Sequence, residues 1–488
     1  MLLRFSKFVC TTFASLLFAV SIAYSAPDTH RFDQLLKTSW YGVYMGDAKV
    51  GYMKTSLDKI EAPVAGWRME AQMTLAMKMG AVEATMTIHD TRIFKSPDGG
   101  LDSSSFVISS PNGDISVEGQ TRGDRFVMTS NIGGQVTEKE YAAPFDCLDS
   151  VLWTELHVLS GKAAVGDSFD FAVFEPTPPL TGLVHQHLRI SGKENYFFNG
   201  VVVEAFSYEM TLTEAGITAQ GRIDKYGNTL EANLGASMVM RLEGEALAKQ
   251  LDEAYDIISG SLVIPRGKIT NPSALNRLTL KISGIDTSQI LTNDIQKVSP
   301  DTDGVILEIA RQEEPTGMAA DSPLPPGIDE DLKSEPLIQS DDLEIKELAK
   351  EIVGHEKNRW HAAIKINDWV YNNIEKRYSP DFSNALQTLN TRKGDCGEHT
   401  ALAVALLRAA GIPARPIAGL VYWPPGNGFG YHAWTEVYAG RWVEMDPTWG
   451  EELANPSHIA LAHGDIIEQV RVLYRVMGNI KIDILDAN

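Results

Sequence analysis

Three residues in the last third of the chain have the types that thiol chemistry needs: Cys396, His432 and Asp446. Asp395 comes just before Cys396, and Glu398 lies three residues after Asp395, which is the spacing of a capping box at the start of a helix. We therefore expect Cys396 in the first helical turn, where the helix end favours thiolate over thiol. The free amides of that turn can also stabilise an oxyanion if they point at the reacting carbonyl.

The histidine and the aspartate lie on two segments that form a predicted hairpin. Alternate residues of a strand share a face, so the loop length decides whether the two side chains meet. A three-residue loop, Tyr438-Ala439-Gly440, puts His432 directly opposite Asp446, whereas a two-residue loop leaves them out of step. Such loops need a residue with positive φ at the third position, and Gly440 stands there. The sequence therefore predicts that the imidazole faces the carboxylate.

This geometry gives each residue a role in a catalytic triad. His432 takes the proton from Cys396 and returns one to the leaving group, while Asp446 orients the imidazole and stabilises its charged form. Taken singly, His432 also fits a structural sheet histidine, and Asp446 also fits the start of a turn with Pro447. Their coincidence with a cysteine at a helix start favours the triad.

Residues 386–449 resemble the transglutaminase-like superfamily. The resemblance rests on Leu389, Lys393-Gly394-Asp395-Cys396-Gly397-Glu398, Leu406–Arg415, Gly419, His432-Ala433-Trp434-Thr435-Glu436-Val437 and Trp442-Val443-Glu444-Met445-Asp446-Pro447-Thr448. It implies a papain-like α+β fold with Cys396 as nucleophile, His432 as base and Asp446 as third member. The resemblance covers residues 340–465, about a quarter of the chain, and leaves the preceding regions unexplained.

The elements that must position these residues follow from hydrophobic periodicity. Apolar residues at helical spacing predict helices over residues 341–353 and 358–375, and a third helix over residues 396–410. Strands are expected near residues 415–422, 431–437 and 441–446. Helices followed by an antiparallel sheet predict an α+β catalytic domain over residues 341–465.

Aromatic residues near the predicted site are candidates for substrate binding. Tyr422 and Trp423 open a Pro- and Gly-rich stretch before His432, which fits either a mobile flap over the acyl site or an ordinary long turn. Tyr378 is a candidate for closing the cleft or donating to the oxyanion.

The sequence offers no recognisable metal set and no cofactor motif. Glu398, His399, His458 and His463 lie nearby in the sequence, but their spacing fits no ligand pattern, and a thiol nucleophile needs no metal. We therefore expect neither a metal nor a cofactor.

The chain is long enough for two to four domains, since it has 488 residues of which 44% are hydrophobic and 22% charged. Short alternating segments between tight turns predict a large antiparallel β domain, a sandwich or an open barrel, over residues 26–255. A small β domain is expected over residues 256–314, an exposed linker rich in Pro and acidic residues over 315–340, and a β extension over 466–488. The result is a multidomain protein with a C-terminal catalytic domain.

The first 25 residues have the layout of a secretory signal peptide. Arg4 and Lys7 precede an apolar run, residues 8–23, and small residues stand before a cleavage site after Ser25. An uncleaved anchor is the alternative, although the run is short for a span of about 20 residues. We expect a periplasmic or secreted protein with no stable membrane insertion after cleavage. A formal net charge of −21 argues against nucleic acid as a partner.

The expected reaction begins with an acyl-enzyme on Cys396, and the acceptor decides the outcome. Attack by water makes a peptidase or amidase, and attack by an amine makes a protein-glutamine acyltransferase that cross-links proteins. We predict the hydrolase, acting on protein or peptide amides of the cell envelope. Amine transfer, a non-catalytic envelope binding module, and a latent enzyme covered by its own β domain are the alternatives.

Overall fold

The computed structural model describes residues 32–61, 65–79, 82–110, 113–132, 134–178, 181–234, 238–251, 255–256, 262–285, 287–377, 384–464 and 480–488. Contacts divide the chain into two compact units, which among the described residues are 32–256 and 262–488. Within the described ranges, none of the helices combines the length and apolar character that a membrane span needs. The predicted signal peptide lies outside the described residues.

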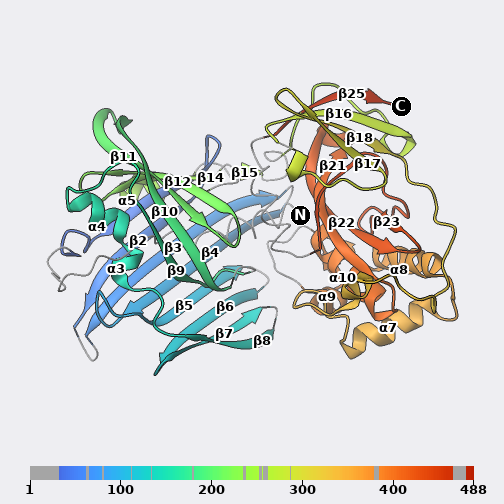
Figure 1. Ribbon diagram of the computed structural model, residues 1–488, viewed down its shortest axis with the longest axis horizontal. Coiled ribbons are helices and arrows are strands. Elements are labelled where there is room, and N and C mark those ends of the chain that lie inside the picture. The colour runs from blue at the N-terminus through green and yellow to red at the C-terminus, as the bar shows by residue number, and fades with distance from the viewer. Residues whose placement is uncertain are drawn as a thin grey trace. The chain divides into compact units, whose positions relative to one another are not determined.

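The first unit is built on one large antiparallel sheet (Figure 1). Its strands are β1 (Thr38–Met45), β2 (Ala48–Ile60), β3 (Gly66–Met79), β4 (Val82–Phe94), β5 (Leu101–Ser110), β6 (Gly113–Arg122), β7 (Arg125–Ile132), β8 (Gln135–Ala142), β9 (Ser168–Glu175), β10 (Gly182–Phe198), β11 (Val201–Leu212), β12 (Ile217–Asp224), β13 (Thr229–Asn233) and β14 (Met238–Glu243). They run in the order β8 to β1, then β14 to β9, so β1 and β14 are neighbours and β8 and β9 form the edges. The short elements α3 (Leu148–Val151), α4 (Trp153–Leu159), α5 (Glu245–Ala248) and β15 (Tyr255–Asp256) accompany the sheet.

Alternation along the strands explains this sheet. In β12, Ile217, Ala219, Gly221 and Ile223 are buried while the residues that alternate with them are not, because successive side chains point to opposite faces. The two halves of the sheet pack on one another: the rings of Phe126 on β7 and Phe174 on β9 are tilted at 60°, with centroids 4.8 Å apart. The expected sandwich or open barrel is therefore a single curved sheet that encloses its own core.

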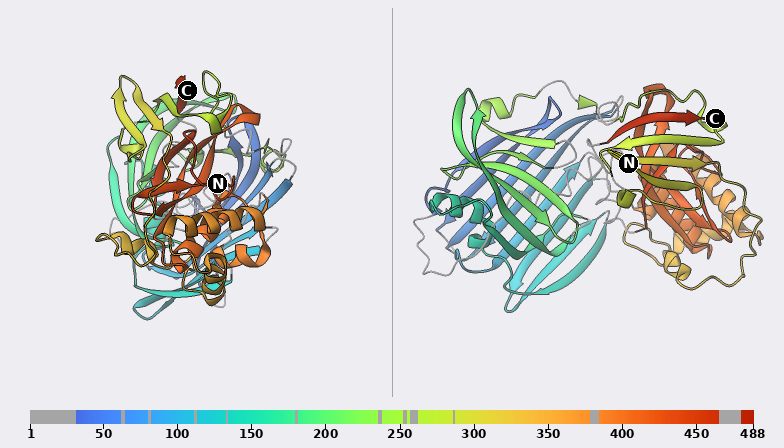
Figure 2. Two further views of the ribbon diagram at one scale, coloured as in Figure 1. Left: turned by 90° about the vertical axis from the view of Figure 1, so that its right-hand side faces the viewer. Right: turned by 45° about the horizontal axis from the view of Figure 1, so that its top comes forward.

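The second unit contains a small four-stranded sheet formed by distant parts of the chain. Its order is β17-β18-β16-β25, with β16 (Arg277–Ser283), β17 (Gln296–Asp301), β18 (Gly304–Ala310) and β25 (Lys481–Ala487). Figure 2 shows the C-terminal strand, in red, beside β16. The expected C-terminal extension thus completes the small β domain. Two short 3-10 helices, η2 (Pro272–Ala274) and η3 (Thr287–Gln289), lie in the loops.

Residues 315–340, the predicted linker, include exposed, half-buried and buried positions, and they are anchored to the helices that follow. The Arg359 guanidinium donates to the carbonyl oxygens of Ala320 at 3.1 Å and Ser322 at 2.6 Å. Arg408 donates to the Glu335 carboxylate at 2.7 Å. The 3-10 helix η4 (Ile328–Leu332) lies within this segment.

The rest of the second unit packs helices against a second four-stranded sheet. Its elements are α7 (Leu343–Val353), α8 (Arg359–Asn373), β19 (Glu375–Lys376), α9 (Ala385–Thr391), β20 (Lys393–Gly394), α10 (Cys396–Ala409), β21 (Ala414–Trp423), η5 (Pro424–Gly426), β22 (Gly428–Tyr438), β23 (Trp442–Met445) and β24 (His458–His463). The sheet order is β23-β22-β21-β24. Helix α10 is buried nearly all round, which fits its run of Ala and Leu, so its first turn is held rigidly against the sheet.

Candidate active site

The first turn of α10 holds Cys396 in the position that the sequence predicts. Asp395 is the N-cap, and its carboxylate accepts a hydrogen bond from the amide of Gly397 at 2.7 Å. The amide of Asp395 donates to the Glu398 carboxylate at 3.0 Å, which completes the capping box. The thiol is thereby fixed at the positive end of a fourteen-residue helix.

The hairpin that carries His432 and Asp446 has a different register from the predicted one. Tyr438 pairs with Trp442 and Thr435 with Met445, so the loop is Ala439-Gly440-Arg441 and His432 is not directly opposite Asp446. The predicted register is wrong by two residues, because Gly440, with φ of 97°, lies in the middle of the loop instead of at its end. An even shift leaves both side chains on the same face.

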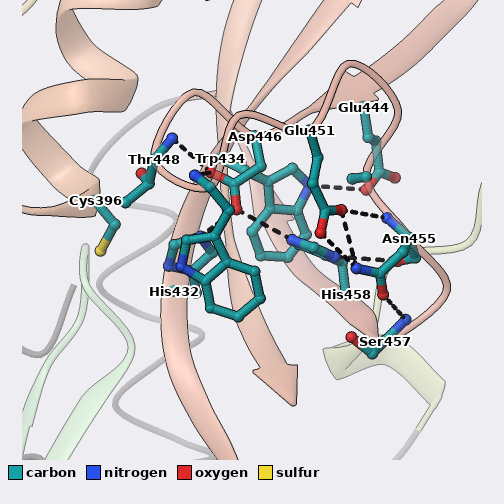
Figure 3. Close-up of polar contacts among 12 residues, drawn as sticks. Cys396, His432, Trp434, Glu444, Asp446, Thr448, Glu451, Asn455, Ser457 and His458 are labelled. Carbon is teal, nitrogen blue, oxygen red and sulfur yellow. Dashed lines mark hydrogen bonds and ion pairs between the residues drawn. The ribbon is translucent and has the colours of Figure 1, made fainter. Parts of the chain in front are cut away.

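The imidazole and the carboxylate meet diagonally across this hairpin (Figure 3). His432 Nε2 lies 2.7 Å from Asp446 Oδ2, and both side chains are almost completely buried. The Cys396 thiol lies beside the His432 ring, close enough for each group to shift the pKa of the other. Because Nε2 is engaged by Asp446, Nδ1 is the ring nitrogen left for the thiol. The structure thus brings the three predicted catalytic residues together.

Electrostatics in this cluster favour a charged pair of imidazolium and thiolate. Burial disfavours the imidazolium, but the Asp446 charge and its hydrogen bond outweigh burial and raise the pKa of His432. Burial also opposes ionisation of Asp446, yet the charge and hydrogen bond of His432 hold the pKa of that carboxyl well below its usual range. Burial and the charge of Asp395 raise the pKa of the Cys396 thiol, whereas His432 lowers it.

The sheet fixes the orientation of His432 through its neighbour on the same face. The Trp434 ring stacks on His432 with ring centroids 6.1 Å apart, and its Nε1–H donates to the buried Glu444 carboxylate at 2.8 Å. Gly419 pairs with His432 on the adjacent strand. A Cβ on Gly419 would stand 1.9 Å from the carbonyl oxygen of Ile459, so only glycine lets these strands pack closely.

Two further aromatic residues lie at the site, and sequence reasoning gave neither a catalytic role. The Trp449 ring is tilted over His432 at a centroid distance of 5.1 Å. His458 Nε2 lies 3.3 Å from Asp446 Oδ2. No local signal marks His458, because β24 reaches the site only through its long-range pairing with β21.

The fold groups His432, Asp446 and His458 as three side chains of the kinds that bind metal ions. Sequence spacing does not reveal this set. Two ligands of a tetrahedral Zn²⁺ stand about 3.3 Å apart, given a metal–ligand distance of about 2.0 Å. His432 Nε2 and Asp446 Oδ2 are 2.7 Å apart, which is a hydrogen-bond distance. The arrangement is therefore that of a hydrogen-bonded triad.

Of the predicted substrate-binding residues, Tyr422 belongs to the core. It is completely buried, its hydroxyl accepts from the Ile269 amide at 3.2 Å, and it donates to Asn427 at 2.8 Å. The prediction for Tyr422 is corrected on that ground, since a ring enclosed and hydrogen-bonded in this way cannot contact substrate. Trp423 is half-buried and stays a candidate, and Tyr378 lies outside the described residues.

With this geometry in place, comparison with known proteins identifies the domain. Residues 346–447 match the model of the Transglutaminase-like superfamily. A curated relative, an uncharacterized protein of Haemophilus influenzae, is 37% identical over 99 residues, which are 19% of this chain and 26% of the relative. The chain thus spans about a quarter of that relative's length.

Two solved structures are similar to parts of this chain. A suspected cysteine protease from Cytophaga hutchinsonii aligns over 42% of this chain and 83% of its own, with 21% identity and a TM-score of 0.29. A β-barrel-like protein from Brucella abortus, of a domain family of unknown function, aligns over 42% of this chain and 94% of its own, with 9% identity and a TM-score of 0.31.

Proposed function

We propose that this protein is an exported thiol hydrolase, a peptidase or amidase that forms an acyl-enzyme on Cys396 with protein or peptide amides. The observation that carries the proposal is the arrangement at the start of α10: a thiol beside His432, whose Nε2 lies 2.7 Å from a buried aspartate. The match of residues 346–447 to the transglutaminase-like domain supports it.

Each step of the reaction uses groups in this arrangement. His432 holds the proton of Cys396, and the thiolate sulfur attacks the amide carbonyl carbon while amides of the first turn of α10 stabilise the oxyanion. The C–N bond then breaks as the imidazolium gives its proton to the leaving amine. Water, deprotonated by His432, attacks the thioester, and the acid leaves as the Cys396 thiolate forms again. Asp446 keeps the imidazole oriented throughout.

The test is acylation by p-nitrophenyl acetate, a small activated acyl donor. We expect a burst of p-nitrophenolate equal to the enzyme concentration, and an acetyl group on the peptide that contains Cys396. Cys396→Ala and His432→Ala should lose the burst, while Cys147→Ala should keep it. Without a burst in the full chain, or with an acetyl group on another residue, the thiol-hydrolase proposal fails and the non-catalytic binding module takes its place.

Amine transfer is the second candidate, because the matched domain is of the transglutaminase-like type. The two reactions share the acyl-enzyme and differ in what consumes it. A primary amine added to the acetylated enzyme distinguishes them. Deacylation that does not respond to the amine supports a hydrolase, and acceleration with formation of the acetylated amine supports an acyltransferase.

Export rests on the first 25 residues, whose charged start, apolar run and small residues before the predicted cleavage site form a secretory leader. We expect the mature chain to begin at Ala26 in the periplasmic or secreted fraction. Cell fractionation followed by N-terminal sequencing tests this, and an intact Met1 in the membrane fraction would indicate the uncleaved anchor.

A further inference from the structure

The Asp446 carboxylate receives more hydrogen bonds than a triad requires. Its Oδ1 accepts from the backbone amides of Thr448 at 2.7 Å and Trp449 at 3.1 Å. Its Oδ2 faces the Nε2 atoms of two imidazoles, His432 at 2.7 Å and His458 at 3.3 Å. Both imidazoles therefore share one oxygen, and the position of His458 bears directly on how that oxygen holds His432.

His458 is fixed at its other nitrogen as well. Its Nδ1 lies 3.1 Å from the carbonyl oxygen of Asn455, and the Asn455 side chain donates to the Glu451 carboxylate at 2.8 and 2.9 Å. A carbonyl and an ionised carboxylate only accept hydrogen bonds. His458 can therefore make both of its bonds only as the doubly protonated imidazolium. Its geometry places a second cation next to the Asp446 oxygen.

Packing leaves the His458 ring little freedom. Only 2% of the residue is exposed, and it begins β24, which pairs with β21 through His458 and Val421. The Trp434 and Trp449 rings meet it edge-on, at centroid distances of 5.1 and 5.8 Å. Figure 3 shows the two histidines approaching Asp446 from different strands. The ring is enclosed by the same two tryptophans that contact His432.

We infer that His458 is a positioning residue of this active site, which holds the same Asp446 oxygen as the catalytic imidazole and supplies a positive charge there. The inference rests on the proposed function, since it concerns the efficiency of the same triad. His458 does not reach the reacting atoms: it acts through Asp446, by fixing the oxygen on which His432 is oriented.

The charged and titratable groups around His458 define what its charge does. Asp446 follows β23, His432 lies on β22, and the Glu451 carboxylate holds the loop before β24. Glu444 on β23 also senses it, since the His458 charge works to lower the pKa of Glu444 against burial and Glu436, which raise it. Among these neighbours His432 is the group whose proton moves in catalysis.

We expect the loss of His458 to shift the alkaline limb of the pH profile of the acylation rate. A cation at His458 competes for the Asp446 charge, so the His432 imidazolium is stabilised less than it would be by Asp446 alone. Removal of the charge should therefore let His432 keep its proton to higher pH. A purely structural role of His458 would lower the amount of folded protein without moving the limb.

The experiment compares His458→Ala and His458→Gln in the full chain, with His463→Gln as the control. His463 lies on the same strand, and its Nδ1 is 3.4 Å from Glu436, away from the triad. The acylation rate with p-nitrophenyl acetate is measured from about pH 5 to about pH 10, which brackets the ordinary histidine and cysteine pKa values. Folding of each variant is checked by circular dichroism.

We expect His458→Ala to lower the acylation rate by about 10- to 100-fold through a loose Asp446. His458→Gln, which keeps a neutral donor, should recover most of the rate while its alkaline limb lies at higher pH than that of the wild type. His463→Gln should match the wild type in both. A folded His458→Ala with the wild-type rate and limb overturns the inference while the wild-type burst leaves the proposed function intact. If the wild type shows no burst of p-nitrophenolate, the proposed function itself is wrong.

Discussion

The two described cysteines show how similar local settings give different chemistry. Cys147 and Cys396 are both buried and outside any disulfide, and each stands at the start of a helix. Burial raises the pKa of Cys147, against the hydrogen bonds of Ser150, which lower it, and its sulfur lies 3.0 Å from the Ser150 hydroxyl. Cys396 instead has the His432 imidazole, which lowers its pKa against burial. A helix start alone therefore does not make a nucleophile.

The helices themselves add to the contrast. Cys147 caps α3, which has four residues, and its sulfur accepts from the amide of Ser150 at 3.3 Å. Cys396 is the first residue of the fourteen-residue α10, where Asp395 and not the cysteine caps the helix. One cysteine holds a turn together, and the other is presented to a base.

The largest expected effect separates the two cysteines by mutation. Cys396→Ala should reduce acylation by p-nitrophenyl acetate about 10³-fold or more, because the nucleophile is lost. Cys147→Ala should change the acylation rate less than twofold, an order-of-magnitude expectation for a residue outside the site. Burst amplitude and acylation rate are the measurements. A comparable loss in both variants would break the comparison.

The next effect removes the feature that distinguishes the cysteines. In His432→Ala, Cys396 has only its helix start, so alkylation by iodoacetamide near pH 6 should slow by about 100-fold. The measurement is the rate of mass gain on the Cys396 peptide. Labelling that stays as fast as in the wild type would mean that the helix end, and not the imidazole, activates the thiol.

The two units can also be compared through buried carboxyl groups whose pKa values are shifted. In the first unit Glu175 is completely buried, and burial raises its pKa to about 7, although Arg92 and Thr177 lower it. The pKa of Glu175 in the folded state lies above the ordinary Glu value. Between about pH 5 and about pH 8 the folded state therefore binds more protons than the unfolded state. The free energy of unfolding should therefore fall as pH rises from about 5 to about 8.

Glu175→Gln tests this directly, since the amide cannot ionise. We expect the variant to lose about 2 kcal/mol less stability than the wild type over that pH interval. Urea midpoints from pulse proteolysis, read on peptides of residues 32–256, supply the measurement. Equal pH dependence in both proteins would show that Glu175 does not titrate in this range.

A smaller effect concerns Asp446, whose pKa is held low by His432. Asp446→Asn removes the charge that raises the pKa of His432, so the alkaline limb of the acylation profile should move down by about one pH unit or more. This shift is opposite to the one expected for His458→Gln. If the alkaline limb of the acylation profile does not move, the group that titrates there is not His432.

Local signals in the sequence predicted the parts of the site that depend on near neighbours. The capping box around Cys396 needs only Asp395 and Glu398, and the structure has it as predicted. The shared face of His432 and Asp446 follows from the two-residue period of strands, which survives the wrong register. The register itself failed because several loop positions for Gly440 satisfy the same turn chemistry.

Features that depend on distant pairing could not be predicted in this way. His458 reaches Asp446 only because β24 pairs with β21 across the sheet, and no spacing in the sequence encodes that contact. Tyr422 looked available beside a Pro- and Gly-rich stretch, but the amide of Ile269, more than 150 residues earlier, contacts its hydroxyl. In the first unit, the pairing of β1 with β14 that joins the halves of the sheet is equally non-local.

The most direct test of the central claim, that the imidazole and not the helix start activates Cys396, uses both cysteines of one protein. Iodoacetamide labelling of the full chain is followed from about pH 5 to about pH 9, with the two cysteine peptides quantified separately. The account predicts rapid labelling of Cys396 well below the ordinary cysteine pKa, and labelling of Cys147 only at high pH. Parallel profiles that both rise near the ordinary cysteine pKa would contradict it.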